Sequence, residues 1–307
     1  MKVFLVEDIH PEALAALQSC AEIVSDWNRI GEVDAILNRN LRLGRDLLSK
    51  APSLKVIAIH GTGSDCVDME YCRAHGITVA YVPFQNSDSV AELLVGMTLA
   101  LLRKICMGDR MVKAGEAVQS APAALFGAEL VGKTVGFIGT GDIAVRTARI
   151  FREGFRARVI GYSPSLTDAA ATERGLERRD SIEAVLREAD VICPCVHLTP
   201  STEKLLGEEQ FSHCKPGAVL VNASRGGVVD EDALYRALTE KRLAGAACDV
   251  WREEPPAATL PLVQLPNVIA LPHIGANTDE ALRRVGMGCV RAILDVFGGN
   301  RPQYVYE

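Results

Sequence analysis

The sequence lacks an apolar run long enough to cross a membrane. Its most apolar segment, 90–105, contains Glu92 and is interrupted again by Arg103 and Lys104, whereas a membrane-spanning helix needs about 20 apolar residues in succession. The N-terminal apolar run, 3–6, is followed at once by two acidic residues, which is not the pattern of a secretory signal peptide. We therefore expect a cytoplasmic protein without a membrane partner.

Dense basic clusters and metal-binding cysteine pairs are also lacking. The 33 Lys and Arg residues are outnumbered by 39 Asp and Glu, which gives a net charge of −6 and argues against a nucleic-acid partner. The nine cysteines are scattered and include no C-x-x-C pair, so we expect no metal site. Most of these thiols are expected to be buried as small apolar side chains in a reducing compartment.

What the sequence does contain is an alternation of strand-like and helix-like segments over 307 residues, a length that favours two domains. This alternation predicts an α/β protein with parallel sheets. In the first part we expect helices at 11–18 and 66–75 and strands at 2–6, 34–37, 56–59 and 78–80. In the second part we expect helices at 142–151, 181–188 and 231–240 and six strands at 134–138, 158–162, 191–195, 218–222, 245–250 and 268–271. Six such strands suit a doubly wound, Rossmann-type nucleotide-binding domain.

Two further helical patterns set the expected domain boundaries. The segment 90–104 is apolar nearly all round, so both of its faces must be buried, either between domains or at a subunit interface. The last helix, 278–297, follows the second strand series and can pack back on the first domain. We therefore predict a discontinuous domain of residues 1–100 and 279–307, and a dinucleotide-binding domain of residues 101–278.

A glycine-rich motif follows the strand at 134–138 and begins a helix. It has the form G-x-G-x-x-A and comprises Gly139, Thr140, Gly141, Asp142, Ile143 and Ala144. In a dinucleotide site the first glycine allows a tight turn, the second lets the backbone approach the pyrophosphate, and the small third residue allows close helix packing. A glycine turn without a ligand is the alternative, which the strand–turn–helix context disfavours.

The residue that ends the next strand normally distinguishes NAD from NADP. An acid there binds the ribose 2′-hydroxyl of NAD, but this chain has Ser163 at that place. No Arg or Lys follows closely to attract the 2′-phosphate of NADP. Because a serine hydroxyl can bond to either form, the cofactor is NAD or NADP with the preference open.

Three polar positions follow successive strands of the second series. Arg225 can bind a carboxylate in bidentate fashion, Glu254 can orient an imidazole, and His273 can act as an acid. Alone, Arg225 could be a surface arginine that caps a loop, and His273 could be a packed or solvated histidine. Together, at strand ends where α/β sheets bind ligands, they predict proton transfer to a substrate carbonyl beside a nicotinamide.

On these residues the chain resembles the D-isomer-specific 2-hydroxyacid dehydrogenases. The resemblance covers nearly the whole chain and includes the segments "HGTGSDCVDMEYCRAHGITV", "GKTVGFIGTGDIA", "KPGAVLVNASRGGVVDEDAL", "GAACDVWREEP" and "LPHIGANT". It implies interconversion of a 2-oxo acid and a D-2-hydroxy acid, with His273 as acid/base, Glu254 (not Glu253) as its partner and Arg225 as the substrate arginine. It also implies a flavodoxin-like substrate domain that closes by a hinge on the Rossmann domain.

The same resemblance implies further contacts. Cofactor contacts are expected from Gly139, Thr140, Gly141, Asp142, Ile143, Ser163, Val196, His197, Thr202, Ala223, Ser224, Asp249, His273 and Gly275. Substrate contacts are expected from His60, Gly61, Thr62, Gly63, Arg225 and His273. Candidates for the pocket of the substrate side chain are His60, Thr62, Phe84 and Trp251. A homodimer is implied, and an NAD(H)-sensing, co-repressor-like binding protein on the same fold is the alternative function.

Overall fold

The computed structural model describes residues 1–117 and 119–307 and separates them into two units. Unit 1 comprises residues 1–86 and 276–307, and unit 2 comprises residues 87–275. The expected boundary at residue 100 requires a correction, because it falls inside helix α4 (Ser87–Leu102). This helix belongs wholly to unit 2, where its buried side chains share a core with strands of that unit.

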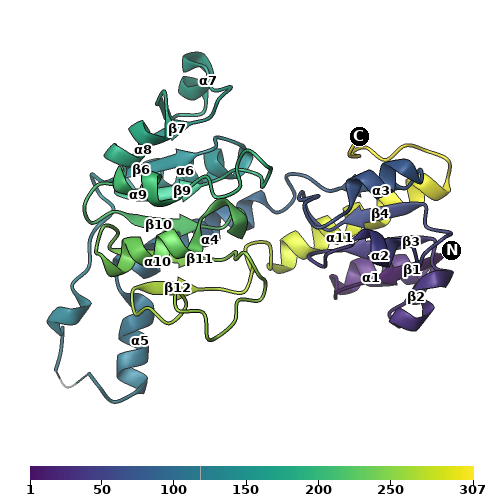
Figure 1. Ribbon diagram of the computed structural model, residues 1–307, viewed down its shortest axis with the longest axis horizontal. Coiled ribbons are helices and arrows are strands. Elements are labelled where there is room, and N and C mark those ends of the chain that lie inside the picture. Colours follow the sequence, from purple (N-terminus) through teal and green to yellow (C-terminus); the bar gives the residue numbers. More distant parts are fainter. Residues whose placement is uncertain (118) are drawn as a thin grey trace. The chain divides into compact units, whose positions relative to one another are not determined.

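Unit 1 is built on a five-stranded parallel sheet with the strand order β2-β1-β3-β4-β5 (Figure 1). This is the order of flavodoxin-like sheets, so the predicted architecture of the first domain is confirmed. The strands are β1 (Lys2–Leu5), β2 (Glu22–Val24), β3 (Ala35–Asn38), β4 (Val56–Ile59) and β5 (Thr78–Tyr81). Strand β2 was not predicted, because it is a three-residue edge strand with only its last side chain buried.

Helices cover both faces of this sheet. One face packs against α1 (Pro11–Gln18) and α11 (Asp279–Phe297), so the C-terminal helix does return to the first domain. The other face packs against α2 (Arg45–Leu48), α3 (Met69–Ala74) and the 3₁₀ helix η1 (Trp27–Glu32). Helix α3 is shorter than the predicted 66–75, because the Asp68 carboxylate caps it by accepting a 2.9 Å hydrogen bond from the Tyr71 N–H.

Unit 2 contains a seven-stranded parallel sheet with the order β12-β11-β10-β9-β6-β7-β8. The strands are β6 (Thr134–Ile138), β7 (Arg158–Tyr162), β8 (Glu177–Arg178), β9 (Val191–Pro194), β10 (Val219–Asn222), β11 (Gly245–Cys248) and β12 (Val268–Ala270). Six of these were predicted, and the seventh, β8, is an exposed two-residue edge strand without an apolar signal. The direction of winding reverses between β6 and β9, the place where doubly wound sheets bind ligands.

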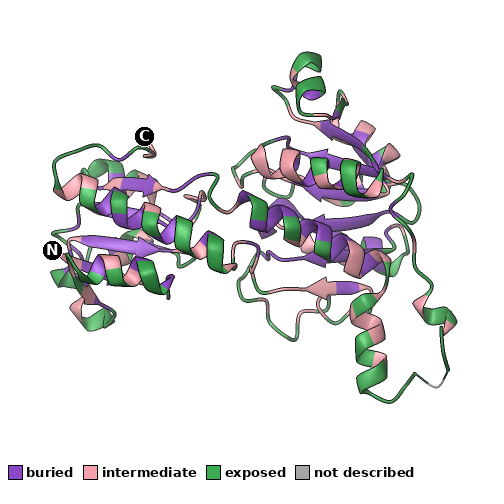
Figure 2. Cartoon of the chain, turned by 180° about the vertical axis from the view of Figure 1, so that it is seen from behind, coloured by how far each residue is buried: buried purple, intermediate pink, exposed green. Residues whose placement is uncertain are grey.

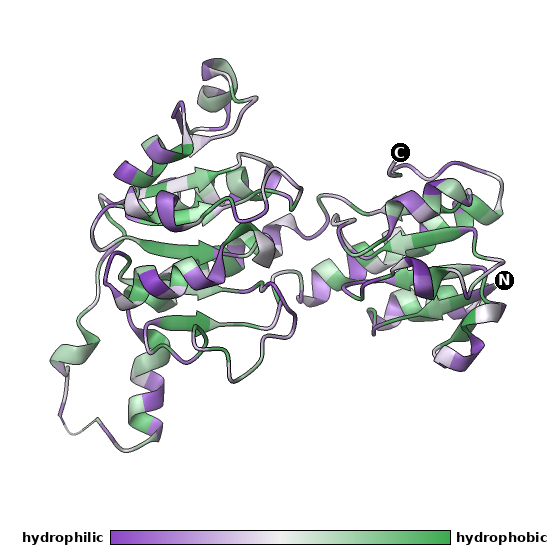
Figure 3. Cartoon of the chain, viewed as in Figure 1, coloured by the Kyte–Doolittle hydropathy of each residue, from purple (hydrophilic) through white to green (hydrophobic). Residues whose placement is uncertain are grey.

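The sheet of unit 2 lies between two helical layers. One core joins the strands to α8 (Ile182–Glu188), α9 (Glu208–Ser212) and α10 (Glu231–Thr239), and the other joins them to α4 and α6 (Asp142–Phe155). The strands are buried and apolar, while the outer sides of the helices are exposed (Figures 2 and 3). The remaining elements are α5 (Ile105–Lys113), α7 (Asp168–Glu173), η2 (Ala123–Leu125) and η3 (Gly226–Val228).

The apolar composition of helix α4 is explained by its burial on several sides. Its many apolar side chains pack against α6 and against strands β10 and β11 of the same unit, so the helix is buried within unit 2 rather than forming part of the first domain. Across residues 1–117 and 119–307, no helix combines the length and the apolar character that a membrane span requires.

Candidate active site

Three strand ends of unit 2 lie side by side because their strands are in register. Strands β10, β11 and β12 are consecutive parallel neighbours, with Asn222 opposite Cys248 and Cys248 opposite Ala270. The chain therefore leaves these strands at one edge of the sheet and at one level. The three loops that follow carry the arginine, the glutamate and the histidine that the sequence singled out.

The loop after β10 holds Arg225 through a buried asparagine. The Asn222 side chain donates to the Arg225 carbonyl (3.1 Å), and its oxygen accepts from the N–H and the hydroxyl of Ser224 (2.9 and 2.8 Å). The Arg225 guanidinium is half-buried and donates to the Ser224 carbonyl at 2.8 Å. Sequence reasoning did not single out Asn222, although a polar residue ending an apolar strand was the available signal.

Gly226 lets the arginine loop pack directly against the loop that follows β11. A Cβ at this position would lie 1.9 Å from the carbonyl carbon of Trp251 and 2.1 Å from its oxygen. Both of these atoms belong to the backbone and cannot swing aside, so only glycine fits here. Arg225 is therefore fixed relative to the segment that carries Glu254.

The histidine and the glutamate form a direct pair. Nδ1 of His273 lies 2.6 Å from Oε2 of Glu254, and the two side chains are 27% and 29% exposed. The other carboxylate oxygen, Oε1, accepts a 3.0 Å hydrogen bond from the Trp251 N–H. Because a carboxylate only accepts, it fixes the imidazole tautomer with a proton on Nδ1, which leaves Nε2 for another partner.

The electrostatics of Glu254 follow from this pairing. Burial by itself would raise the pKa of the carboxyl, but the hydrogen bond and charge of His273, the Trp251 N–H and the charge of Arg225 together lower it. Glu254 is therefore ionised at neutral pH and acts as a fixed acceptor beside the imidazole.

Trp251, a candidate for the pocket of the substrate side chain, is a core side chain of unit 2. Its side chain is 3% exposed and belongs to the core of unit 2, and its indole N–H donates to the Leu271 carbonyl at 2.8 Å. The indole thereby ties the glutamate loop to the end of β12. Its role is to hold two neighbouring loops together, which a side-chain type alone does not reveal.

Asp249 organises the backbone around His273. Its own carbonyl accepts from the His273 N–H (2.8 Å), and its carboxylate accepts from the N–H groups of Ile274 and Gly275 (2.8 Å each). Burial raises the pKa of this carboxyl, while the two backbone donors oppose that rise. His273 has a φ of 59°, a left-handed conformation that the contacts with Asp249 and Glu254 hold in place.

The glycine-rich loop has the shape that a dinucleotide needs. Gly139 has a φ of 92°, and a Cβ there would lie 2.3 Å from the Cys195 carbonyl oxygen. In contrast, a Cβ on Gly141 would meet no atom within 4 Å, so space is open at the start of the 14-residue helix α6. Backbone N–H groups and the helix dipole make such a position favourable for a pyrophosphate. The residues present therefore fit a nicotinamide dinucleotide.

The remaining residues expected to contact the cofactor lie on loops at the same edge of the sheet. Val196 packs on Gly139, and the turn after β9 is closed by a 2.6 Å hydrogen bond from the Thr202 hydroxyl to the His197 carbonyl. Ala223 and Ser224 follow β10 directly, and Ser163 follows β7. The Ser163 hydroxyl lies 3.0 Å from that of Thr140, which joins the ends of β7 and β6.

The glycine loop of unit 1 follows β4. Gly61 has a φ of 145°, and its carbonyl accepts from the Val82 N–H at 2.8 Å, while the Thr62 carbonyl accepts from the Tyr306 hydroxyl. The His60 imidazole is buried, and a Cβ on Gly286 of α11 would lie 3.8 Å from its Nε2. Burial and the charge of Arg39 lower the pKa of His60 to about 4, so the ring is neutral at physiological pH.

Neither a metal site nor a disulfide is found in the part of the chain that the structure describes. No cluster of three or more His, Cys, Asp or Glu residues there could hold a metal ion, and the nine cysteines are free. Burial raises the pKa of Cys195 to about 12, so this thiol is not a reactive thiolate.

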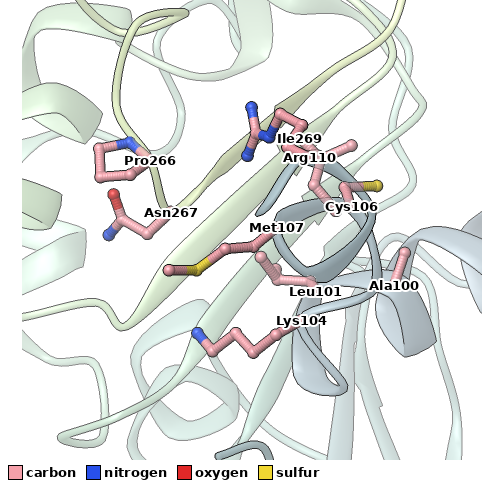
Figure 4. Close-up of a pocket in the computed structure, with 9 residues that line it drawn as sticks. All are labelled: Ala100, Leu101, Lys104, Cys106, Met107, Arg110, Pro266, Asn267 and Ile269. Atoms are coloured by element: carbon pink, nitrogen blue, oxygen red, sulfur yellow. The ribbon is translucent and has the colours of Figure 1, made fainter. Parts of the chain in front are cut away.

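A separate hollow of about 150 Å³ lies between α4, α5 and the start of β12 (Figure 4). Its lining is mainly apolar and includes neither Arg225 nor Glu254 nor His273. The residues are Ala100, Leu101, Lys104, Cys106, Met107, Arg110, Pro266, Asn267 and Ile269.

Comparison with known proteins agrees with the architecture of unit 2. Residues 95–275 match the family model of the NAD binding domain of D-isomer specific 2-hydroxyacid dehydrogenases. The glyoxylate reductase of Thermofilum pendens is 33% identical over 98% of this chain and 93% of its own length. The D-3-phosphoglycerate dehydrogenase of Methanocaldococcus jannaschii is 36% identical over 99% of this chain, but the chain spans only 59% of that relative.

A solved structure shows the same fold with a nucleotide bound. The NADPH-dependent glyoxylate/hydroxypyruvate reductase of Sinorhizobium meliloti, in complex with NADP and malonate, superposes with a TM-score of 0.88. It is 26% identical, and the match covers 99% of this chain and 96% of that one.

Proposed function

The chain belongs to the D-isomer specific 2-hydroxyacid dehydrogenase family, a family of NAD(P)-dependent oxidoreductases, and we propose that it interconverts a 2-oxo acid and the D-2-hydroxy acid. The observation that carries this proposal is the 2.6 Å pair of His273 and Glu254 at the ligand-binding edge of the dinucleotide domain. The relatives that act on glyoxylate and hydroxypyruvate support a small 2-oxo acid as the substrate.

The proton in this reaction is assigned to His273. Glu254 holds the proton on Nδ1, so Nε2 is the atom that gives a proton to the carbonyl oxygen during reduction and takes it back during oxidation. The nicotinamide, when bound, supplies or accepts the hydride. Residues of the Gly139–Ala144 loop would hold its pyrophosphate, and the loops that carry Asp249 and Gly275 would hold its nicotinamide end.

Arg225 is assigned to the acid group of the substrate. Its planar guanidinium can bind a carboxylate and a carbonyl oxygen together, which both orients and polarises the carbonyl. Asn222 and Gly226 fix its position relative to Glu254. We further propose that the backbone of Gly61, Thr62 and Gly63 contributes donors to the substrate carboxylate.

We also propose that the protein is a homodimer. Helix α5 has no buried residue, and Ile105, Val112 and Phe126 in and after it are 56%, 69% and 75% exposed. Helix α5 also lines the mainly apolar hollow shown in Figure 4, through Cys106 and Met107. Such patches mark protein interfaces, and a second copy of this chain is the occupant we assign.

The enzymatic proposal is tested by following NADH and NADPH absorbance with glyoxylate, hydroxypyruvate, pyruvate and bulkier 2-oxo acids. We expect turnover with at least one acid and a fall of roughly 10²- to 10⁴-fold in kcat for His273→Ala, which removes the proton donor. Tight nucleotide binding with no turnover across the panel would overturn the proposal and favour an NAD(H)-sensing protein instead.

A further inference from the structure

Arg174 lies near the end of β7 in the fold, although it stands eleven positions after Ser163 in the sequence. Arg174, which follows α7, places Nη1 2.9 Å from the Thr140 carbonyl and 3.2 Å from the Thr140 hydroxyl. That hydroxyl lies 3.0 Å from Ser163. In Figure 1, α7 lies next to β7 at one end of the unit 2 sheet, where it contacts the edge strand β8. We propose that Arg174 and Ser163 form a subsite for the 2′-phosphate of NADP, so that the protein prefers NADPH to NADH. This inference rests on the proposed use of a nicotinamide cofactor.

Arg174 and Ser163 lie where a dinucleotide domain binds the adenosine ribose. The Gly139 N–H donates to the carbonyl of Tyr162, the last residue of β7, at 2.8 Å, so the glycine-rich loop and the start of the following segment are directly joined. The residue after this strand is the one that meets the adenosine ribose in dinucleotide domains. Here that residue is Ser163, so the carboxylate that would accept from a 2′-hydroxyl and repel a 2′-phosphate is replaced by a neutral group.

The charge of Arg174 distinguishes it from the other arginines nearby. The neighbouring arginines Arg152, Arg158, Arg178 and Arg179 each form an ion pair with at least one carboxylate. Arg174 is exposed and forms no ion pair with any carboxylate in the described part of the chain, since the hydrogen bonds of its guanidinium go to neutral Thr140 atoms. Its positive charge is therefore uncompensated beside the position of the ribose, where a dianionic phosphate is attracted and a neutral hydroxyl is not.

The directions of the hydrogen bonds among Arg174, Thr140 and Ser163 also favour a phosphate. An arginine only donates, so the Thr140 hydroxyl accepts a hydrogen bond from Arg174 and can use its own O–H to donate one to the Ser163 oxygen. Ser163 then has a proton to donate outward. The guanidinium and the Ser163 hydroxyl both present donors, and a phosphate offers only acceptors at neutral pH. A 2′-hydroxyl can accept one of these bonds, so NADH still binds, but more weakly.

The test measures binding rather than turnover. Calorimetric titrations would compare NADPH with NADH, and 2′,5′-ADP with 5′-ADP, in the purified protein. We expect the 2′-phosphorylated member of each pair to bind at least tenfold more tightly. Arg174→Gln, which keeps a donor but removes the charge, should weaken the 2′-phosphorylated ligands roughly 10- to 100-fold, as the loss of a charge-assisted hydrogen bond implies, and leave NADH nearly unchanged.

Matched variants separate this inference from the proposed function. Arg178→Gln removes a nearby arginine that is already paired with Asp168 and Asp180, and it should leave the ratio of NADPH to NADH affinity unchanged. Ser163→Asp should reverse the preference even if Arg174→Gln fails to fold. Equal affinity of the wild type for the two members of each pair would overturn the inference alone. Failure of all four ligands to bind would overturn the proposed function as well.

Discussion

Replacing Glu254 by glutamine tests the pairing of His273 more sharply than removing the side chain. The carboxylate accepts two hydrogen bonds, one from His273 Nδ1 and one from the Trp251 N–H. An amide of the same shape has one accepting oxygen and one donating nitrogen. Glu254→Gln therefore satisfies only one of the two donors, or it turns its N–H toward Nδ1 and selects the other imidazole tautomer. In the first case the imidazole loses its ionised partner, and in the second the proton of the neutral ring lies on Nε2 instead of Nδ1.

The expected fall in kcat follows from the loss of a hydrogen bond to the charged Glu254 carboxylate. A hydrogen bond to a charged group contributes roughly 1.5–3 kcal/mol. Because each 1.36 kcal/mol corresponds to about a tenfold change in rate, kcat for reduction of the 2-oxo acid should fall roughly 10- to 150-fold. The KM of the nucleotide should change little, since Glu254 is not among the residues assigned to the cofactor. The assay is steady-state absorbance of the nucleotide with the best acid of the panel.

The stability of this variant should depend on pH in a defined direction. The pKa of Glu254 is lowered in the folded protein, so its ionised form stabilises the fold above the ordinary value of 4.5, and this contribution is lost as the pH falls through the lowered value. Urea unfolding should show Glu254→Gln less stable than wild type at pH 7, with the difference shrinking in acid. The matched control is Glu253→Gln, an exposed neighbour. Equal kcat values for Glu254→Gln and Glu253→Gln would refute the assigned role.

Four further variants test the loops of the site and the proposed dimer. Gly226→Ala places a Cβ against the Trp251 backbone and should destabilise the protein by about 1–3 kcal/mol in urea unfolding, whereas Gly141→Ala, with open space around it, should leave stability unchanged but weaken nucleotide binding in calorimetry. Asp249→Asn leaves one of the Ile274 and Gly275 N–H groups without an acceptor and should cost about 1–3 kcal/mol of unfolding free energy. Val112→Ser combined with Phe126→Ser should convert the dimer to monomer in sedimentation velocity, and an unchanged dimer would show that another surface pairs the subunits.

Much of the fold could be predicted because its signals are local. Buried parallel strands are continuous apolar runs, and six of the seven strands of unit 2 were recognised in this way. Strands β2 and β8 were not predicted, because they are short, largely exposed edge strands that bury few side chains. Helix α5 was not predicted for a similar reason: none of its residues is buried, so its sequence has no apolar face set by packing against a core. The boundary at residue 100 was misplaced because an apolar helix does not reveal which sheet it packs against.

The site was predictable where its residues directly follow strands. Parallel strands in register bring their ends together, so the positions of Arg225 and His273 could be inferred from strand order alone. Asn222, Gly226 and Trp251 could not be assigned in the same way, since their roles lie in backbone contacts between loops. Whether a buried side chain lines a pocket or ties two loops together depends on its orientation, which no spacing encodes.

Arg174 shows why cofactor preference was left open by the sequence. It stands eleven positions after Ser163, on the far side of a helix, and it reaches the glycine-rich loop only through tertiary structure. A rule that inspects the residues immediately after β7 finds a serine and no cation, and therefore cannot decide. The physical requirement is a positive charge near the ribose, and a long arginine side chain can meet it from any neighbouring element. Specificity in this domain is thus a property of the loop cluster at the end of β6 and β7, and changing it would require acting on both Arg174 and Ser163.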